Sequence, residues 1–445
     1  MAVRILIVGA GGREHALARQ LALSPQRPVI FVAPGNPGTA GVARNVPFNA
    51  DAPDRLAAFC ADEKIGLVLV GPEDPLIAGL ADRLRAAGLA VFGPGADGAR
   101  IEGDKAWAKE ILAAAGVPTA PYALFDNRVD ALAHLARVAC PVVVKAVGAA
   151  QGKGVAVCPD RASAAAHVEA CLGERRFGRA GERVLIESCL EGPELSVLAV
   201  TDGRDYALLA PARDHKRVGD GDAGPNTGGM GAFAPVPLGD PTLAGVIARR
   251  VIEPTLAELR RRAIDFRGVL YAGLMLTAAG PQVLEFNCRF GDPETQAVLP
   301  LLRGDFLALM QATAAGRLGE HLAQLPPCGP GAPCDWPGAS LTDWTRACVA
   351  VVGAAAGYPG PYARGTAVRL PAAPGDEAAW IVHAGTALVD GRLVTAGGRV
   401  LAAVGLGAAP ARARDRAYAL MAGISSDGLH YRRDIARAAG ARAEV

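Results

Sequence analysis

The chain has 445 residues, of which 51% are hydrophobic and 20% are charged, and its formal net charge is +2. The length allows about three domains, and the composition is that of a globular protein with no basic excess that would favour nucleic acid as a partner. Nine cysteines without a CxxC pair argue against a disulfide framework and indicate reduced thiols, as in the cytoplasm. No apolar run approaches the ~20 residues of a membrane-spanning helix, and the first residues carry no signal-peptide pattern.

The first pattern along the chain is ILIVGAGGREHALARQLA, residues 5–22, in which a glycine turn joins an apolar run to a helical pattern. A dinucleotide fingerprint needs three glycines, and Glu14 stands where the third belongs. The acidic ribose ligand expected after the second strand is also missing, because that strand runs into Pro34 and Gly35. A dinucleotide is therefore disfavoured, whereas a single phosphate at the helix N-terminus and a plain glycine turn both remain open.

Residues 3–100 alternate short apolar runs with helical stretches, one of them over residues 76–87. Continuous apolar strands separated by helices predict a parallel sheet that is covered on both faces. Ligands bind beyond the carboxyl ends of such strands. The loops at those ends carry Arg13, Asn36 and Glu73, so we expect these three residues to line one pocket.

Two further parts follow. A helix is predicted over GDKAWAKEILAAAGVP, because Gly116 and Pro118 supply the usual stop signals. From about Val142, strands interrupted by glycine turns indicate a larger α+β unit. The Pro- and Gly-rich residues 325–338 indicate a linker or surface loop, and the strand patterns and helix after it predict a small third domain.

The segment VVVKAVGAAQGKGVAV places Lys145 on a strand, followed by a glycine turn with Lys153 and a second strand. Its spacing does not match a Walker A loop, which also requires a Ser or Thr and a helix. It resembles a flexible hairpin that closes on ATP phosphates, where glycines admit the backbone and lysines neutralise charge. Taken alone, an exposed hairpin with a solvated lysine is the commoner explanation.

The segment VLEFNCRFGDPE carries Glu285, Asn287 and Arg289 at alternate positions of a predicted strand, so they project from one face. A carboxylate beside an amide oxygen suits magnesium that carries substrate phosphates. Arg289 could hold a carboxylate or phosphate with two hydrogen bonds. An ordinary solvated sheet face is the less favoured alternative, because three polar side chains on an apolar strand need partners.

Residues 214–235, DHKRVGDGDAGPNTGGMGAFAP, are too rich in glycine and charge for a helix or a core strand. They are also longer than a minimal connection, which favours a functional loop. Composition alone is also compatible with a disordered surface insertion.

A series of motifs follows one another along the chain: GAGGREHAL, VAPGNPGT, GPEDPL, DHKRVGD, GPNTGGMGA, LYAGLM and EFNCRFGDPETQ. They stand in the same order as in the phosphoribosylamine–glycine ligase family, also called glycinamide ribonucleotide synthetases, which the chain resembles over nearly its whole length. YPGPYARG, VHAGT and GGRVL continue the resemblance near the C-terminus. The resemblance implies an ATP-grasp enzyme of de novo purine synthesis. Such an enzyme joins glycine to 5-phosphoribosylamine through a glycyl phosphate and splits ATP to ADP and phosphate.

The implied architecture is a multidomain α/β and α+β protein. It has an N-terminal parallel α/β (pre-ATP-grasp) domain at 1–101, a central ATP-grasp domain at 102–325, and a linker with a small mixed β domain at 326–445. The implied cofactors are ATP, as a substrate, and Mg2+ or Mn2+. The implied partners are glycine and 5-phosphoribosylamine, and we expect a cytoplasmic monomer that binds neither nucleic acid nor a membrane.

The resemblance also implies roles for individual residues. The ATP site maps onto Lys105, Lys145, Gly152, Lys153, Gly154, Glu187, Leu190 and Glu194. The metal ligands fall on Glu285 and Asn287. The substrate site maps onto Gly11, Gly12, Arg13, Asn36, Glu73, Gly291 and Asp292. Arg289, Asp214 and Lys216 take the catalytic places near the reacting glycine.

Three residues depart from the family pattern. Val147 replaces an aspartate beside the phosphate-binding hairpin, Ser188 replaces a second glutamate, and Pro193 replaces a polar residue. The loss of charge at Val147 keeps a catalytically silent nucleotide-binding protein open as a competing function. An ATP-grasp ligase for a different carboxylate and a nicotinamide-dependent oxidoreductase built on the N-terminal glycine turn are the two remaining competitors.

Overall fold

The computed structural model describes residues 2–150, 154–238, 242–333, 335–371 and 377–437. Within these ranges the larger sheets have four or five strands each, and two short two-stranded ribbons accompany them. None of the helices in the described ranges combines the length and the apolar character needed to cross a bilayer. The described cysteines are free thiols.

The N-terminal part is the predicted parallel sheet, with the strand order β3-β2-β1-β4-β5. The strands are β1 Arg4–Gly9, β2 Val29–Pro34, β3 Arg44–Asn45, β4 Leu67–Val70 and β5 Val91–Phe92. The helices are α1 Gly12–Ala22, η1 Thr39–Gly41, α2 Pro53–Asp62, α3 Glu73–Ile77 and α4 Leu80–Ala86. The central strand β1 is buried on both faces, since Ile5, Leu6 and Ile7 are all fully covered. This confirms the expectation drawn from its continuous apolar sequence.

The helix predicted over residues 76–87 is two helices. Gly79 adopts φ +82°, ψ +22° between α3 and α4. This left-handed conformation is open to glycine at little cost and interrupts the helical hydrogen-bond pattern. The apolar periodicity on either side of Gly79 conceals the break from a prediction based on sequence.

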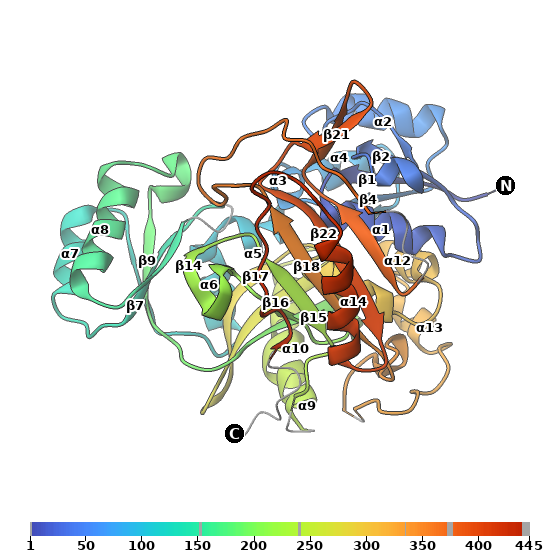
Figure 1. Ribbon diagram of the computed structural model, residues 1–445. Helices are drawn as coiled ribbons and strands as arrows, with labels where there is room; N and C mark the ends of the chain where they lie inside the picture. Colours follow the sequence, from blue (N-terminus) through green and yellow to red (C-terminus); the bar gives the residue numbers. More distant parts are fainter. Residues whose placement is uncertain (1, 151–153, 239–241, 334, 372–376, 438–445) are drawn as a thin grey trace.

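A separate four-stranded sheet, which we call the lid sheet, projects to one side of the molecule with α7 and α8 on its outer face (Figure 1). Its order is β6-β9-β7-β8. The elements are β6 Tyr122–Phe125, α7 Arg128–Leu135, β7 Val142–Ala146, β8 Val155–Cys158, α8 Arg161–Val168, η2 Glu169–Gly173, η3 Gly178–Gly181 and β9 Val184–Ser188. Helices α5 Ala96–Gly103 and α6 Lys105–Ala114 precede it in the chain.

The central sheet has the antiparallel order β11-β10-β16-β17. Its strands are β10 Glu194–Thr201, β11 Tyr206–Leu208, β16 Gly268–Thr277 and β17 Gly280–Asn287. The helical elements of this part are α9 Leu243–Ile247, η5 Ala248–Ile252, α10 Glu253–Arg261, α11 Glu294–Val298, η6 Leu299–Leu301, α12 Phe306–Ala314 and α13 Leu318–Leu322. The sequence GVLYAGLMLT forms β16, and the strand predicted around VLEFNCRF is β17, which ends at Asn287.

The C-terminal sheet takes strands from two distant parts of the chain, in the order β12-β15-β18-β22-β19. Its strands are β12 Arg213–Asp214, β15 Gly231–Ala234, β18 Ala347–Ala354, β19 Ala379–His383 and β22 Arg399–Gly407. The nearby elements are β13 Arg217–Gly219, η4 Asp220–Asp222, β14 Ala223–Asn226, η7 Ala339–Leu341, β20 Thr386–Val389, β21 Arg392–Thr395 and α14 Pro410–Ala422. Residues 214–235 therefore contain short paired strands and are not a disordered insertion.

The Pro- and Gly-rich segment after residue 325 is anchored at Trp336. Its side chain is 2% exposed, and its indole Nε1 donates a hydrogen bond of 3.1 Å to the Leu208 carbonyl oxygen. Trp344 stacks edge-on against it. This part of the expected surface loop is held against the edge of the central sheet, because a buried indole needs both apolar cover and an acceptor.

Candidate functional site

A cavity of about 820 Å³ lies between the lid sheet and the central sheet. The sequence-predicted residues that line it are Lys145, Glu187, Leu190, Glu194, Asp214, Lys216 and Glu285. They come from the lid sheet, the connection that follows it, the strands after residue 212 and the end of the central sheet. The structure thus brings together side chains that lie far apart in the sequence.

One wall of this cavity is apolar. Val143 and Val157 face each other across β7 and β8, and Met275 and Leu284 contribute from the central sheet. Val157 is 46% exposed although it belongs to a sheet. A slot between apolar side chains, with residues 188–190 also in the lining of the cavity, suits a flat aromatic base that hydrogen-bonds through its rim.

A buried charge cluster closes the deep end of this slot. The Lys145 Nζ atom lies 2.7 Å from Glu187 Oε2, and the Lys109 Nζ atom lies 3.1 Å from Glu187 Oε1. Lys145 also donates to the Leu284 carbonyl oxygen at 3.0 Å, which ties the lid sheet to the central sheet. Burial lowers the pKa of Lys109. Lys109 is absent from the residues predicted for the site, although its spacing of four residues from Lys105 on one helix face was a usable signal.

The carboxylate of Glu285 lies among lysines. Its Oε1 is 3.5 Å from Lys216 Nζ, which is also 3.2 Å from Glu194 Oε2. Burial opposes ionisation of Glu285, but Lys216, Lys145 and Lys105 outweigh it and lower the pKa of Glu285 to about 2. Glu285 is therefore ionised at neutral pH and surrounded by cations that would also attract phosphate.

Glu285 and Asn287 flank the buried Phe286 at the end of β17, so they share one face of the strand. Their carboxylate and amide oxygens are hard donors, which fits a magnesium-type ion. The described residues contain no group of three or more His, Cys, Asp or Glu side chains able to hold a metal. An ion at this place would accordingly need phosphate oxygens or water to complete its coordination.

Asp214 is a buried carboxyl group that lacks a full set of partners. Its Oδ1 atom makes no hydrogen bond to any described residue. Burial and the nearby Glu294 raise the pKa of Asp214 well above its ordinary value. Gly229, at φ +108°, passes so close that a Cβ there would lie 2.7 Å from this oxygen. The glycine-rich segment therefore lets the backbone approach Asp214 directly.

The N-terminal glycine turn is filled by a side chain of the protein. The Gly11 amide donates to Glu14 Oε2 at 2.6 Å, and Arg13 Nε lies 2.6 Å from Glu14 Oε1. A Cβ on Gly9 would lie 2.6 Å from the Glu14 side chain. The carboxylate thus occupies the place beside the turn where a pyrophosphate would approach, which gives a physical reason against a dinucleotide. A phosphate would compete with Glu14 for the Gly11 amide.

Arg289 lies two residues beyond the end of β17 rather than on the strand. Its Nη2 atom is 2.6 Å from Glu102 Oε1, and its Nε atom is 3.1 Å from Glu73 Oε2. Burial opposes the charge, but these carboxylates outweigh it and raise the pKa of Arg289. The structure thus joins Glu73, predicted in the substrate site, to Arg289, predicted in the catalytic group. Glu102 was missed, because nothing local in its helix sets it apart.

Asp292 lies where the three parts of the chain meet. Its Oδ1 accepts a hydrogen bond from Gln296 at 2.8 Å, and Oδ2 lies 3.2 Å from Arg399 Nη2. Arg399 also donates to the carbonyl oxygens of Asp292 and Gly228. A Cβ on Gly11 would lie 3.5 Å from Asp292 Oδ2. Arg399 stands in the motif GGRVL, which marked the residue although no role was assigned to it.

The other predicted residues take the following places. Lys105 Nζ donates to the Gly148 carbonyl oxygen at 3.0 Å. Gly154 accepts from the Ala146 amide at 2.7 Å. A Cβ on Gly291 would lie 2.4 Å from the Glu294 carboxylate, and one on Gly12 would lie 2.7 Å from Gln296. Gly152 and Lys153 lie outside the described residues.

The side chain of Asn36 makes its hydrogen bonds to other groups of the protein. Its Nδ2 atom donates to the carbonyl oxygens of Ala10 and His383, and its Oδ1 atom accepts from the amides of Gly38 and Thr39. The side chain fixes the second loop against the first. Arg13, Asn36 and Glu73 are held by protein partners in this structure and are absent from the lining of the 820 Å³ cavity.

His15 is buried beside Asn36's turn, and its Nδ1 accepts the His383 amide at 2.8 Å. Burial, with a smaller contribution from His383, lowers the pKa of His15 from 6.5 to about 3. Below pH 6.5 the unfolded chain binds a proton that the folded chain refuses, so stability falls as pH falls. The free energy of unfolding changes by about 1.4 kcal/mol per pH unit for one such group, so His15 should lower it by about 2 kcal/mol between pH 6.5 and pH 5.

Urea unfolding at pH 7.5 and pH 5 checks this expectation. His15→Asn, which keeps an acceptor for the His383 amide, should flatten the pH dependence relative to the unmodified chain. His134→Asn, on the lid helix α7, serves as the control and should leave the slope in place. If the free energy of unfolding of His15→Asn depended on pH as strongly as that of the unmodified chain, His15 would not be the source of the pH dependence.

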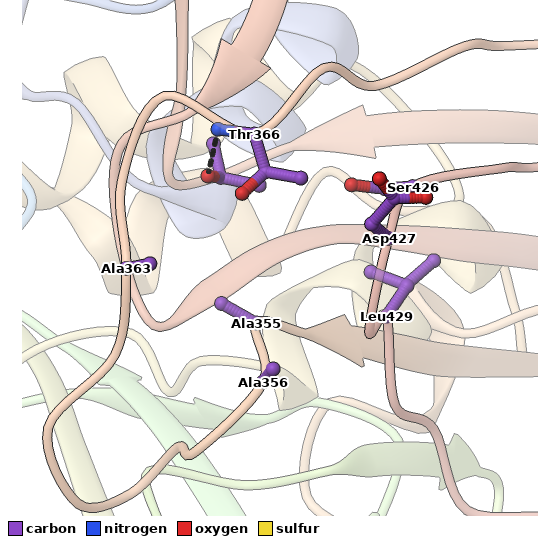
Figure 2. Close-up of a pocket in the computed structure, with 8 residues that line it drawn as sticks. Ala355, Ala356, Ala363, Thr366, Ser426, Asp427 and Leu429 are labelled. Carbon is purple, nitrogen blue, oxygen red and sulfur yellow. Dashed lines mark hydrogen bonds between the residues drawn. The ribbon is translucent and has the colours of Figure 1, made fainter.

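A second hollow, of about 20 Å³, lies in the C-terminal part and is shown in Figure 2. Its lining is mostly small, with Ala355, Ala356 and Ala363 around it, and the Thr366 amide donates to Thr395 Oγ1 at 3.1 Å. This volume holds about one water molecule. It cannot accommodate a substrate.

The departure at Val147 has a structural explanation. Its side chain is 3% exposed and packs with Ala106 and Leu185. Its backbone amide donates to the Arg183 carbonyl oxygen, and its own carbonyl oxygen accepts from the Lys105 amide. An apolar residue suits this place, while the backbone still links the hairpin to α6.

The fold and the cavity between the two sheets define an ATP-grasp protein, and a family model for the phosphoribosylglycinamide synthetase ATP-grasp (A) domain matches residues 103–295. Models for the N domain and the C domain of the same synthetase match residues 3–102 and 348–438. The chain belongs to the phosphoribosylamine–glycine ligase family.

Relatives match the chain from end to end. A phosphoribosylamine–glycine ligase from Nostoc is 46% identical, over 97% of this chain and 99% of the relative. One from Allochromatium vinosum is 47% identical, over 99% of both. A crystal structure of the ligase from Thermotoga maritima has a TM-score of 0.81 at 32% identity and covers 97% of this chain and all of its own.

A more distant structure shares the fold alone. The biotin carboxylase domain of Hydrogenobacter thermophilus 2-oxoglutarate carboxylase has a TM-score of 0.70 at 15% identity, covering 96% of this chain and 91% of its own. The similarity extends over nearly all of both chains. The arrangement of sheets around the cavity is thus common to proteins whose sequences have diverged widely.

Proposed function

We propose that this chain joins glycine to 5-phosphoribosylamine in de novo purine synthesis, giving glycinamide ribonucleotide while ATP is split to ADP and phosphate. The observation that carries the proposal is the cavity itself. Its lining combines apolar side chains with Glu285, Lys145 and Lys216. Lys105 adds to the positive charge that lowers the pKa of Glu285. Membership of the ligase family supports glycine and phosphoribosylamine as the substrates. We further propose a cytoplasmic monomer with domains at 1–101, 102–325 and 326–445.

The proposed ATP site uses the slot for the base, with the backbone near Leu190 at its rim and Glu194 for the ribose. Lys105 and Lys145, together with the hairpin of Gly152, Lys153 and Gly154, would neutralise the phosphates. Glu285 and Asn287 would hold Mg2+ or Mn2+, which supplies charge stabilisation to a phosphoryl group in transfer.

The proposed substrate site lies towards the junction of the three parts. Gly11, Gly12, Arg13, Asn36 and Glu73 would receive phosphoribosylamine, with Gly291 and Asp292 between this site and the cavity. Asp214, Lys216 and Arg289 would hold the reacting glycine. The Oδ1 atom of Asp214, which has no hydrogen-bond partner among the described residues, could accept a hydrogen bond from a substrate.

The proposed chemistry has two steps. A glycine carboxylate oxygen attacks the γ-phosphorus of ATP and ADP leaves, which gives glycyl phosphate. The amine of phosphoribosylamine then attacks the acyl carbon, loses a proton, and expels phosphate. A free carboxylate would have to expel oxide, so the phosphoryl group supplies the leaving group. No protein nucleophile is needed.

Oxygen labelling tests this sequence of bonds. Glycine labelled with heavy oxygen in its carboxylate should deliver one labelled oxygen to each phosphate formed, in step with product and only when ATP, a divalent metal and phosphoribosylamine are all present. Unlabelled phosphate beside genuine product would rule out glycyl phosphate.

Product formation with other carboxylates, nucleotide binding and the spectrum with NADH separate the competing functions. A different carboxylate that replaces glycine with higher kcat/KM would indicate another ligase. Nucleotide binding without product under any combination of substrates would indicate a silent binding protein. A spectral shift on adding NADH would favour the oxidoreductase.

A further inference from the structure

The last described segment of the chain, residues 430–437 (Figure 1, dark red), lies against β13 and η4 and contributes to the lining of the 820 Å³ cavity. We call it the C-terminal strap. Arg432, Arg433, Asp434 and Arg437 are among the residues that line the cavity. The family match reaches residue 438, but no residue of this segment is among those predicted for the site. A piece of the C-terminal part thus forms a wall of the proposed nucleotide site.

The strap is bonded to the turn over residues 217–222. Its Arg433 amide donates to Asp220 Oδ1 at 2.7 Å, and the Gly221 amide donates to Asp434 Oδ2 at 2.8 Å. His430 Nε2 lies 2.8 Å from the Val218 carbonyl oxygen. These bonds run in both directions between two segments more than 200 residues apart in sequence.

Arg432 is the centre of this contact. Its side chain is 1% exposed. Its guanidinium donates two hydrogen bonds of 2.8 Å to the Asp434 carboxylate. Its Nη1 atom donates to Asp222 Oδ1 at 2.7 Å and to the Arg217 carbonyl oxygen at 3.1 Å. A planar guanidinium is suited to such a forked arrangement, and a lysine ammonium is not.

The turn that Arg432 holds directly follows Lys216. The Arg217 carbonyl that Arg432 binds is one residue from the lysine that contacts both Glu194 and Glu285. On its other side, His215 is anchored by the Gly231 carbonyl and the Met230 amide. Thr227 holds Lys216 itself, since its amide and its Oγ1 atom each donate to the Lys216 carbonyl oxygen at 2.8 Å. The place of the Lys216 ammonium therefore depends on several supports, of which the strap is the one that comes from the C-terminal part.

We infer that Arg432 is a positioning residue for the nucleotide site, where it holds the 217–222 turn so that Lys216 meets the phosphates and the carboxylate of Glu285. The inference rests on the proposed function, because it takes the cavity to be the ATP site. It assigns the C-terminal part a role in binding ATP. The effect of Arg432 on Lys216 passes through the turn, because its guanidinium bonds go to Asp434, Asp222 and the Arg217 carbonyl oxygen.

The test compares three variants of the full chain. Arg432→Gln removes the forked contact, and Arg432→Lys keeps the charge without the fork. Asp222→Ala removes one arm of the contact through a side chain that is 70% exposed, so folding should not depend on it. Arg267→Gln is the control, because Arg267 also binds a carboxylate and a carbonyl oxygen but does not line the cavity.

ATP binding by calorimetry and the separate KM values for ATP, glycine and phosphoribosylamine are the readouts. Arg432→Gln should weaken ATP binding about tenfold or more, while the KM for phosphoribosylamine stays within about twofold. Arg432→Lys should recover part of the loss. Asp222→Ala should weaken ATP binding about threefold, and the control should match the unmodified chain.

Two results would overturn the inference. One is unchanged ATP binding in Asp222→Ala together with a folded Arg432→Gln that binds ATP normally. The other is an equal shift of all three KM values, as a purely structural defect would produce. Failure of the unmodified chain to bind ATP would instead count against the proposed function, so the two failures are distinguishable.

Discussion

Glu285→Gln should lower kcat by about 100-fold or more while the chain remains folded. The substitution removes a full negative charge that three lysines hold in its ionised form, and it replaces a charged carboxylate donor at the proposed metal site with a neutral amide. Loss of one preorganised electrostatic group typically costs about 10²–10³ in kcat. Steady-state kinetics at several magnesium concentrations measures the loss, and thermal unfolding shows whether the fold survives.

A neighbour on the same strand provides the control. Gln282 lies on β17, and its Nε2 atom donates to Thr277 Oγ1 at 3.3 Å, outside the lining of the cavity. Gln282→Ala should leave kcat and its magnesium dependence unchanged. If Glu285→Gln kept full activity at low magnesium, the metal assignment would be wrong.

The sequence predicts most reliably where a single local pattern decides the structure. The apolar run around Leu6 could only be covered on both faces, and it forms the central strand of the parallel sheet. The alternation of Glu285, Phe286 and Asn287 correctly predicts a strand with two polar positions on one face. In both places the periodicity and the tertiary environment agree.

Prediction failed where one residue or one distant contact decides the outcome. The break at Gly79 needs a left-handed residue inside an otherwise continuous helical pattern. Trp336 is buried because the edge of the central sheet offers an acceptor, which composition cannot reveal. Among the short strands from Arg213 onwards, β12 pairs with β15 and β15 pairs with the distant β18, which no local pattern reveals.

The candidate site shows the same division. Motifs located Lys145, Glu187 and Glu285, which the fold brings to one cavity. Glu102 and Arg432 were not predicted, because the side chains that they contact lie far away in sequence. Arg289 is 187 residues from Glu102, and Asp222 is 210 residues from Arg432. Carboxylates and arginines on a helix or loop are usually solvated, so only the assembled structure distinguishes these two.

Arg289→Met should destabilise the fold by about 3–5 kcal/mol, because it leaves two carboxylates without their cation. Glu73 and Glu102 contact the same guanidinium. Burial raises the pKa of Glu102 even with Arg289 present, so its charge has little other support. Urea unfolding at pH 7.5 measures the loss, and protonation of the stranded carboxyls should make the loss smaller at pH 5.

A triple variant separates the stabilising role of Arg289 from its proposed contact with substrate. Combining Arg289→Met with Glu73→Gln and Glu102→Gln removes all three charges, and replacing a complete buried ion group is often nearly neutral for stability. The triple variant should therefore recover most of the lost stability but stay inactive, because no guanidinium remains for glycine or phosphoribosylamine. Recovery of turnover together with stability would show that Arg289 acts only within the fold, and its place among the catalytic residues would then have to be given up.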